Sequence, residues 1–300
     1  MKDVVVLGGS GGEHLAVRIA ELLGSELGEI EVKQFPDGET YIRILADVSG
    51  KRVVYVNSLQ RGPNSLIVET LYTLDALKDL GAREVYAVIP YMAYARQDER
   101  FNPGEAVSIF SLAKLFRALS IDGIYTVDMH LHRITDPTKL FGAKFHNLTG
   151  VRELGKYVKS NYSLDNAIVI GPDEEAEQWA KIMAEELGGL EYSVLEKKRI
   201  SAEEVVIEAR GIGVSGKNVV LVDDIISTGG TVVESVKALR KLGAREIIVA
   251  CVHPLLVGRA YPRLLRLGLK DLIGTDTVLS PISKVSVAPA IVEALRKTLA

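Results

Sequence analysis

The chain has 300 residues, of which 47% are hydrophobic and 25% are charged, with a formal net charge of −3 at pH 7. This balance predicts one large or two ordinary soluble domains, and the lack of a basic excess argues against a nucleic-acid partner. The longest apolar runs are far shorter than the roughly 20 residues of a membrane-spanning helix, so no membrane partner is expected. The single cysteine, Cys251, excludes an internal disulfide and fits a reducing compartment, so we expect a cytoplasmic protein.

Predicted strands and helices alternate along the chain. The predicted strands are Val4–Leu7, Val85–Pro90, Gly123–Val127 and Ala167–Ile170. The predicted helices are Leu15–Leu23, Ala106–Leu119, Glu175–Leu187 and Ala288–Leu299. This order is typical of an α/β fold in which a mainly parallel sheet is flanked by helices on both faces.

Two loops near the N-terminus contain glycine and other turn residues. GGSGGEH, from Gly8 to His14, follows the first strand, but its spacing is not GxGxxG and no acidic residue ends a second strand about twenty residues later. We therefore expect a steric role beneath the following helix rather than a dinucleotide site. KQFPDGETYIRI, from Lys33 to Ile44, is predicted to be hairpin-like with a surface turn at Pro36–Glu39.

The chain contains an internal repeat. The segments Leu71–Tyr91 and Val232–Pro254 match closely, both contain LGARE, and upstream RVVYVNS aligns with NVVLVDD about 160 residues later. Two copies of a strand–loop–helix–strand unit predict duplicated α/β domains, which we place at residues 1–147 and 148–300. In the first copy Asn57 and Ser58 replace two carboxylates, so this copy keeps the scaffold without the chemistry of the second.

A polar segment follows the predicted strand at Val85–Pro90, where α/β sheets bind ligands. It runs from Pro90 to Ser108 and reads PYMAYARQDERFNPGEAVS. Its Arg96 can grip a polyphosphate through two hydrogen bonds, and its Gln97 can read a base edge. A solvated charged loop has the same pattern, so the spacing alone leaves both interpretations open.

DMHLHR follows the predicted strand at Gly123–Val127. Asp128, His130 and His132 alternate, so on an extended chain they would face one side. The pattern fits a metal site, a proton relay or a structural histidine pair. Asp173, after the Ala167–Ile170 strand, adds a carboxylate, and such an oxygen-rich set with one imidazole suits Mg²⁺ carried on a nucleotide better than Zn²⁺.

LEKKRISAEEV, from Leu195 to Val205, places three cations after a short apolar strand: Lys197, Lys198 and Arg199. Such a run is either a solvated surface or a mobile flap that closes over phosphates.

VVLVDDIISTGGT, from Val219 to Thr231, predicts a buried strand, a tight turn and a helix start. Free N–H groups at a helix start attract a phosphate, and Gly229 and Gly230 let the main chain approach it closely. The adjacent carboxylates of Asp223 and Asp224 suit a vicinal diol. A ribose 5-phosphate has both groups, and the stretch resembles the phosphoribosyl-diphosphate (PRPP) loop of the type I phosphoribosyltransferases.

The motifs together resemble the ribose-phosphate diphosphokinases, or PRPP synthases. KQFPDGET, PYMAYARQDERF, DMH, the KKR run and VVLVDDIISTGGT occur in that family in this order and at these separations. The resemblance covers nearly the whole chain and implies two tandem phosphoribosyltransferase-like domains. It also implies transfer of the diphosphoryl group of Mg-ATP to the anomeric hydroxyl of ribose 5-phosphate. The chain length and the SAEE segment are more similar to archaeal forms.

The resemblance implies a role for each matching residue. The ATP-binding positions would be Phe35, Asp37, Gly38, Glu39, Arg96 and Gln97. The ribose 5-phosphate positions would be Arg199, Asp223, Asp224, Ser227, Thr228, Gly229, Gly230 and Thr231. The catalytic flap would contain Lys197 and Arg199, and His130 and Asp173 would bind Mg²⁺. Family members place the FPDGE loop in a neighbouring subunit's ATP site, which implies a homodimer or a higher homo-oligomer.

The chain departs from the family pattern in two places. The common SPDAGG stretch is GPDEEA here, so both glycines after Asp173 are lost, and the Gln/Gly/Phe-rich segment after DMH is LHRITDPTKLFG. The second departure leaves regulation by ADP or phosphate open. A phosphoribosyltransferase that consumes PRPP would not explain the first repeat, and a non-catalytic subunit of the family would be expected to lose the flap cations or the diol-binding acids.

Overall fold

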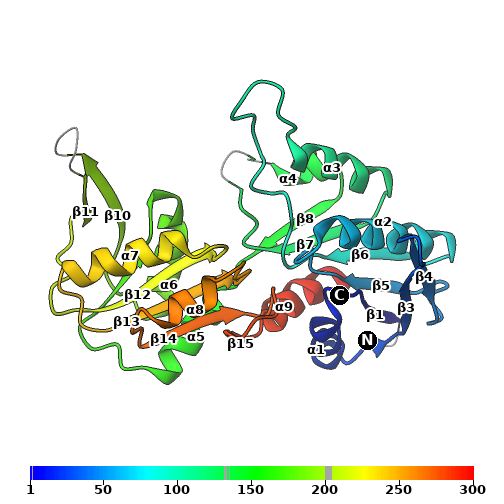
Figure 1. Ribbon diagram of the computed structural model, residues 1–300. Helices are drawn as coiled ribbons and strands as arrows, with labels where there is room; N and C mark the ends of the chain where they lie inside the picture. Colours follow the sequence, from blue (N-terminus) through cyan, green and yellow to red (C-terminus); the bar gives the residue numbers. More distant parts are fainter. Residues whose placement is uncertain (2, 132–133, 135, 200–204) are drawn as a thin grey trace. The chain divides into compact units, whose positions relative to one another are not determined.

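The computed structural model describes residues 1–300 apart from residues 2, 132–133, 135 and 200–204, and for residues 197–199 and 205–207 it describes the backbone alone. The chain forms two compact units, the first made of residues 1–149 and 287–300 and the second of residues 150–286 (Figure 1). Strands and helices alternate in both, which confirms the predicted α/β fold. No helix within the described ranges has the length and apolarity needed to cross a membrane.

The first unit is built on a six-stranded parallel sheet with the strand order β2-β1-β5-β6-β7-β8. Valine-rich strands such as VVVLG of β1 are buried because helices cover both faces of the sheet. The strands are β1 (Val4–Gly8), β2 (Glu26–Leu27), β5 (Arg52–Val56), β6 (Glu84–Val88), β7 (Gly123–Val127) and β8 (Lys144–Leu148).

Helices lie on both faces of this sheet. One face is covered by α2 (Pro63–Asp79), α3 (Ser108–Ala118) and α4 (Pro137–Phe141), and the other by α1 (Glu13–Leu23) and α9 (Ala288–Leu299) (Figure 1). Successive strand residues point to opposite faces, so Val53 and Val85 join one cluster with Leu74 and Leu77 of α2.

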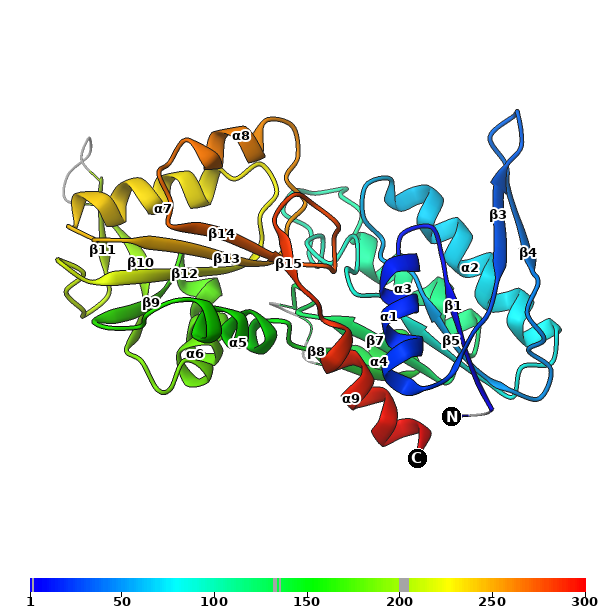
Figure 2. The same cartoon turned by 90° about the horizontal axis from the view of Figure 1, so that it is seen from below.

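A separate hairpin carries the FPDGE sequence. Strands β3 (Ile30–Gln34) and β4 (Thr40–Ile44) pair antiparallel from Ile30 with Ile44 to Gln34 with Thr40, which confirms the predicted hairpin. The hairpin projects away from the sheet of the first unit (Figure 2).

The C-terminal helix α9 belongs to the first unit, although the sequence analysis placed residues 148–300 together in the second domain. Ile291 and Leu295 are fully buried, and α9 packs on α1. Arg296 Nη2 donates to the Leu22 carbonyl at 2.6 Å, and the Tyr125 hydroxyl donates to Thr298 Oγ1 at 2.6 Å. The amphipathic pattern predicted the helix correctly, but an apolar stripe does not say which sheet it covers.

The second unit has a seven-stranded sheet with the order β11-β10-β9-β12-β13-β14-β15, in which only the β10–β11 pair is antiparallel among the described strands. Its strands are β9 (Ala167–Gly171), β10 (Tyr192–Arg199), β11 (Val205–Ala209), β12 (Asn218–Ile225), β13 (Ile247–His253), β14 (Asp271–Thr275) and β15 (Ser283–Val285). Helices α7 (Gly230–Lys241) and α8 (Ala260–Leu265) cover one face, and α5 (Val151–Asn161) and α6 (Glu177–Glu186) cover the other (Figure 2).

The internal repeat corresponds to the same substructure in both units. β5–α2–β6 and β12–α7–β13 are each a pair of adjacent parallel strands joined by a helix. The LGARE segments end the two helices in the same way, because Gly81 and Gly243 adopt left-handed φ values of 81° and 87°. The duplication predicted from the sequence is therefore confirmed.

Candidate active site

Strand β12 delivers two adjacent carboxylates to the carboxyl edge of the second sheet. Its first five residues pack in the core or beside it, and Asp223 and Asp224 follow before the strand ends at Ile225. The Asp224 side chain is buried and Asp223 is partly buried. The Asp224 N–H donates to Asp223 Oδ1 at 3.0 Å. The carboxyl edge of a parallel sheet is where such folds bind ligands.

A third carboxylate comes from the neighbouring strand. β9 pairs with β12 through Ile170 and Leu221, so Asp173, three residues past Ile170, lies at the same edge. Burial raises the pKa of Asp223 well above its usual range, and the charges of Asp224 and Asp173 raise it further. Burial also raises the pKa of Asp173, an effect that the hydrogen bond from the Ala176 N–H to its Oδ1, at 3.3 Å, opposes. This edge therefore favours a proton, a hydroxyl donor or a cation.

The turn after β12 presents unused amide donors. Among the residues that the structure describes, the N–H groups of Ser227 through Val232 have no acceptor, and α7 has no side-chain cap at its start. Thr228 and Thr231, which carry hydroxyl groups, are exposed residues of the same turn. A helix start with free N–H groups is a site for an anion such as a phosphate.

The two glycines of this turn differ in their roles. Gly229 has φ 73°, a left-handed conformation that favours glycine, and a Cβ on it would lie 3.4 Å from Leu264. A Cβ on Gly230 would meet only Thr228 Oγ1, at 3.8 Å. The protein itself therefore leaves the space beside Gly230 open.

Arg263 of α8 contacts the same turn, and its guanidinium donates a hydrogen bond to the Thr228 carbonyl. Arg263 was not predicted as a site residue, because an arginine on a short surface helix belongs to no motif.

The corresponding place in the first unit is filled by protein groups. Asn57 and Ser58 are fully buried. Asn57 Oδ1 accepts from the Gly11 N–H at 2.8 Å, and the buried Glu69 carboxylate accepts from the Ser10 N–H at 2.8 Å and from the Tyr55 hydroxyl at 3.0 Å. A protein carboxylate thus takes two of the donors in this region.

The glycines of the GGSGG loop meet a steric requirement. A Cβ on Gly11 would lie 2.2 Å from the Ser58 carbonyl oxygen, and one on Gly12 would lie 2.4 Å from that of Val56. These contacts agree with the steric role expected from the sequence.

The predicted ATP-binding residues of the hairpin lie at its tip. The Phe35 N–H donates to the Glu39 carbonyl at 2.8 Å, and Gly38 has φ 95°, which closes the turn. The side chains of Phe35, Asp37 and Glu39 are exposed, and Phe35 lies edge-on to Tyr41 at 5.7 Å between ring centroids. The hairpin therefore presents an aromatic ring and two carboxylates to its surroundings.

The predicted ATP-binding residues of the Pro90–Ser108 loop follow β6 in the same unit. Arg96 and Gln97 are exposed, and the Ser108 hydroxyl donates to Gln97 Oε1. Arg96 has no ion-pair partner within the part of the chain that the structure describes. Asp98 is only 5% exposed, so the loop is anchored as well as polar.

The alternation of Asp128, His130 and His132 was predicted for an extended chain, and the chain is not extended at Asp128. Asp128 has φ 36°, and Thr149 Oγ1 donates to its buried carboxylate at 3.2 Å. His130 follows at the carboxyl edge of β7, and His132 lies outside the described residues. His130 is in the first unit and Asp173 in the second, so their joint use as metal ligands stays a prediction. Among the described side chains, no group of three or more His, Cys, Asp or Glu residues forms a metal-binding cluster.

The predicted flap begins as strand β10. The backbone pairs antiparallel with β11, with Lys197 opposite Ile207 and Arg199 opposite Val205. The side chains of Lys197, Lys198 and Arg199 and the whole of residues 200–204 lie outside the described part, so the catalytic roles of Lys197 and Arg199 stay predictions.

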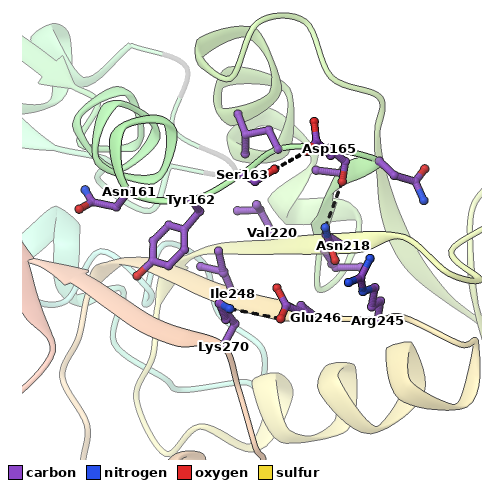
Figure 3. Close-up of a pocket in the computed structure, with 14 residues that line it drawn as sticks. Asn161, Tyr162, Ser163, Asp165, Asn218, Val220, Arg245, Glu246, Ile248 and Lys270 are labelled. Atoms are coloured by element: carbon purple, nitrogen blue, oxygen red, sulfur yellow. Dashed lines mark hydrogen bonds and ion pairs between the residues drawn. The ribbon is translucent and has the colours of Figure 1, made fainter.

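A cavity of about 380 Å³ lies at the amino edge of the second sheet, at the other end of the strands from Asp223 and Asp224 (Figure 3). Val220 and Ile248 line it, and the ion pair of Lys270 with Glu246, at 3.2 Å, lies beside it. None of the predicted site residues lines this cavity, so it is separate from the candidate active site.

Two family models match the chain. The N-terminal domain of ribose phosphate pyrophosphokinase matches residues 4–119, and the phosphoribosyl transferase domain matches residues 146–263. The ribose-phosphate pyrophosphokinase of Methanopyrus kandleri is 44% identical over 294 residues, which cover 97% of this chain and 98% of the relative. Ribose-phosphate pyrophosphokinase 1 of Archaeoglobus fulgidus is 39% identical over 292 residues, covering 97% and 99%.

A solved structure has the same fold throughout. Phosphoribosylpyrophosphate synthetase from Mycobacterium smegmatis superposes with a TM-score of 0.88, at 28% identity, over 99% of both chains. The archaeal relatives and the first family model account for the first unit, which a phosphoribosyltransferase domain alone does not. The resemblance found in the sequence is thereby confirmed, and the chain belongs to the ribose-phosphate pyrophosphokinase family.

Proposed function

We propose that this chain transfers the diphosphoryl group of Mg-ATP to the anomeric hydroxyl of D-ribose 5-phosphate, giving PRPP and AMP. The observation that carries the proposal is the carboxyl edge of β12, where a carboxylate pair precedes a turn with free amide donors. The carboxylates of Asp223 and Asp224 suit hydroxyl groups, and the amide donors of the following turn suit a phosphate. The product would supply phosphoribosyl groups for nucleotide biosynthesis.

The proposed sugar site uses residues of a single turn. The N–H groups of Ser227–Thr231 and the hydroxyls of Thr228 and Thr231 would hold the 5-phosphate. Asp223 and Asp224 would accept hydrogen bonds from the 2- and 3-hydroxyls of the ribose. The raised pKa of Asp223 supports this assignment, because hydroxyl donors relieve the repulsion among Asp223, Asp224 and Asp173.

The proposed ATP site combines Arg96 and Gln97 with the hairpin residues Phe35, Asp37 and Glu39, Gly38 providing the turn. The exposure of the hairpin tip supports a role at a neighbouring molecule, where Phe35 would stack on the base and the carboxylates would accept from it. We therefore propose a homodimer or a larger homo-oligomer with ATP sites shared between subunits.

The donor set of the chain fits Mg²⁺. The carboxylates at the edge of the second sheet are hard oxygen ligands that repel one another, and His130 offers one imidazole. Asp173 and His130 would hold the ion. When bound, Mg²⁺ would neutralise negative charge on the phosphates and make the β-phosphorus a better electrophile.

The chemical step is an in-line displacement at the β-phosphorus of ATP. The anomeric hydroxyl oxygen forms a bond to this phosphorus and its proton passes to solvent, while the bond to the oxygen bridging the α- and β-phosphorus atoms breaks, so AMP leaves with that electron pair. Catalysis of such a step rests mainly on positioning and on charge stabilisation. Lys197 and Arg199 of the flap would supply cations where the leaving group gains negative charge.

The deciding assay is incubation with ribose 5-phosphate and Mg-ATP, followed by separation of the nucleotides and ³¹P NMR of the sugar product. We expect AMP and PRPP in equal amounts. ADP would instead indicate an ordinary kinase. No turnover, together with binding of ribose 5-phosphate, would indicate a non-catalytic subunit.

A further inference from the structure

The turn after β12, residues 226–231, is the turn to which we assign the 5-phosphate. The segment that follows β13 donates hydrogen bonds to its backbone. The Leu256 N–H donates to the Ile226 carbonyl at 3.0 Å, and the Val257 N–H donates to the Ser227 carbonyl at 2.9 Å. The Gly229 carbonyl accepts from the Val233 N–H at 3.0 Å within the first turn of α7. The backbone therefore accounts for three of the four consecutive carbonyls from Ile226 to Gly229.

The fourth carbonyl depends on a side chain. The Thr228 carbonyl accepts a hydrogen bond from the Arg263 guanidinium, and Leu264, the next residue of α8, is fully buried against Gly229. Helix α8 therefore contacts the turn at two consecutive residues, with a charged donor at Thr228 and an apolar side chain at Gly229.

The direction of a carbonyl sets the direction of the next N–H. In a trans peptide the two groups are coplanar and point to opposite sides. Fixing the Thr228 carbonyl toward Arg263 thus aims the Gly229 N–H away from α8, on the side where the donors are unused. Glycine populates both signs of φ, so the peptide before Gly229 has little intrinsic preference of its own.

We propose that Arg263 is a positioning residue for the turn after β12. Its guanidinium holds the Thr228–Gly229 peptide in the orientation that presents the Gly229 N–H to the 5-phosphate. Arg263 acts through this peptide and does not touch the substrate. A charge-assisted hydrogen bond is suited to the task, because it is stronger than a bond between neutral groups. The inference rests on the proposed function, which assigns the phosphate to this turn.

The test compares Arg263→Met with Arg266→Met. Both remove an exposed arginine at the C-terminal end of α8, and within the described part of the chain Arg266 donates no hydrogen bond to the turn. We expect the dissociation constant for ribose 5-phosphate, measured by calorimetry without ATP, to rise about tenfold in R263M and to stay within about twofold of wild type in R266M. The KM for ATP should be unchanged in both. Arg263→Lys should recover part of the affinity, since it keeps a charged donor.

A second measurement separates positioning from direct contact. In ligand-free protein labelled with ¹⁵N-glycine, the resonances of Gly229 and Gly230 should shift in R263M and not in R266M. Weakened sugar binding with unshifted glycine resonances would mean that Arg263 touches the substrate itself, which would overturn the proposal, as would equal affinities for R263M and R266M. If the wild-type protein fails to bind ribose 5-phosphate at all, the proposed function fails instead.

Discussion

Asp223 carries a conflict between stability and binding. Its raised pKa means that the folded protein favours the protonated carboxyl, because burial and the neighbouring carboxylates disfavour the charged form. Its contribution to stability is therefore fully present below the pKa of an unfolded aspartate, 3.8, and is lost as the pH rises through the higher folded value. Above the folded pKa the charged carboxylate is kept at a cost in stability, which is typical of a binding site.

Asp223→Asn should separate the two properties. We expect the substitution to raise the free energy of unfolding at pH 7 by about 0.5–2 kcal/mol, because it removes a charge from the cluster. The gain should shrink as the pH is lowered toward 4. Urea denaturation at several pH values measures the stability, and calorimetry should show much weaker binding of ribose 5-phosphate. Asp75→Asn, at an exposed position on α2, is the matched control and should change neither.

Gly230 tests the space for the phosphate. Gly230→Ala should leave the free energy of unfolding unchanged or raise it by up to about 1 kcal/mol, because the new methyl group meets no protein atom closer than 3.8 Å. Affinity for ribose 5-phosphate should fall at least tenfold, because the methyl group takes room beside the N–H donors. Gly229→Ala is the contrasting variant and should lose about 1–2 kcal/mol of stability through its left-handed φ. Unchanged sugar binding by G230A would place the phosphate elsewhere.

At the scale of elements, the β10–β11 hairpin contains the predicted flap. Lys197 and Arg199 are two residues apart in the sequence, a spacing that on an extended chain is expected to turn both toward one side. We expect Lys197→Ala and Arg199→Ala each to lower kcat by about 10²–10³, the usual effect of losing a donor that stabilises developing charge. Lys198→Ala is the control within the same strand and should be far milder. Steady-state kinetics that found all three variants equally mild would assign the run to a solvated surface.

Secondary-structure elements were predicted from the sequence better than the tertiary contacts that each element makes. The strand-to-helix turn at Asp223–Thr231 and the hairpin at Lys33–Ile44 were correct, because hydrophobic periodicity and turn residues are local signals. The extended chain considered at Asp128 is not present, since Asp128 has φ 36°, and the hydrogen bond of its carboxylate with Thr149 joins residues distant in the sequence. The hydrogen bond from the Ser10 N–H to Glu69 could not be predicted either, because the two residues are far apart in the sequence. Local pattern cannot show which distant group satisfies a buried donor.

At the scale of the whole molecule, the proposed ATP site requires two chains. A Glu39→Ala chain and an Asp223→Ala chain should each be nearly inactive alone, since one lacks part of the ATP site and the other part of the sugar site. After dissociation and reassociation, the mixture should recover activity through hybrid sites in which both intact halves meet. Native mass spectrometry confirms the exchange of subunits. Exchange without recovery would place the hairpin in the ATP site of its own chain.

The return of α9 to the first unit makes the second unit an insertion within the first. Residues 150–286 are contiguous and can complete their fold while the chain is still being synthesised. We expect the first unit to complete its fold only once its last segment is made, because α9 packs on α1 and the Leu299 carbonyl accepts from Arg52 of the central strand β5 at 2.5 Å. A chain that stops early keeps every predicted catalytic residue and exposes the apolar surface that α9 covers. An intact α9 is therefore required for the first unit to fold, although it contributes no predicted catalytic residue.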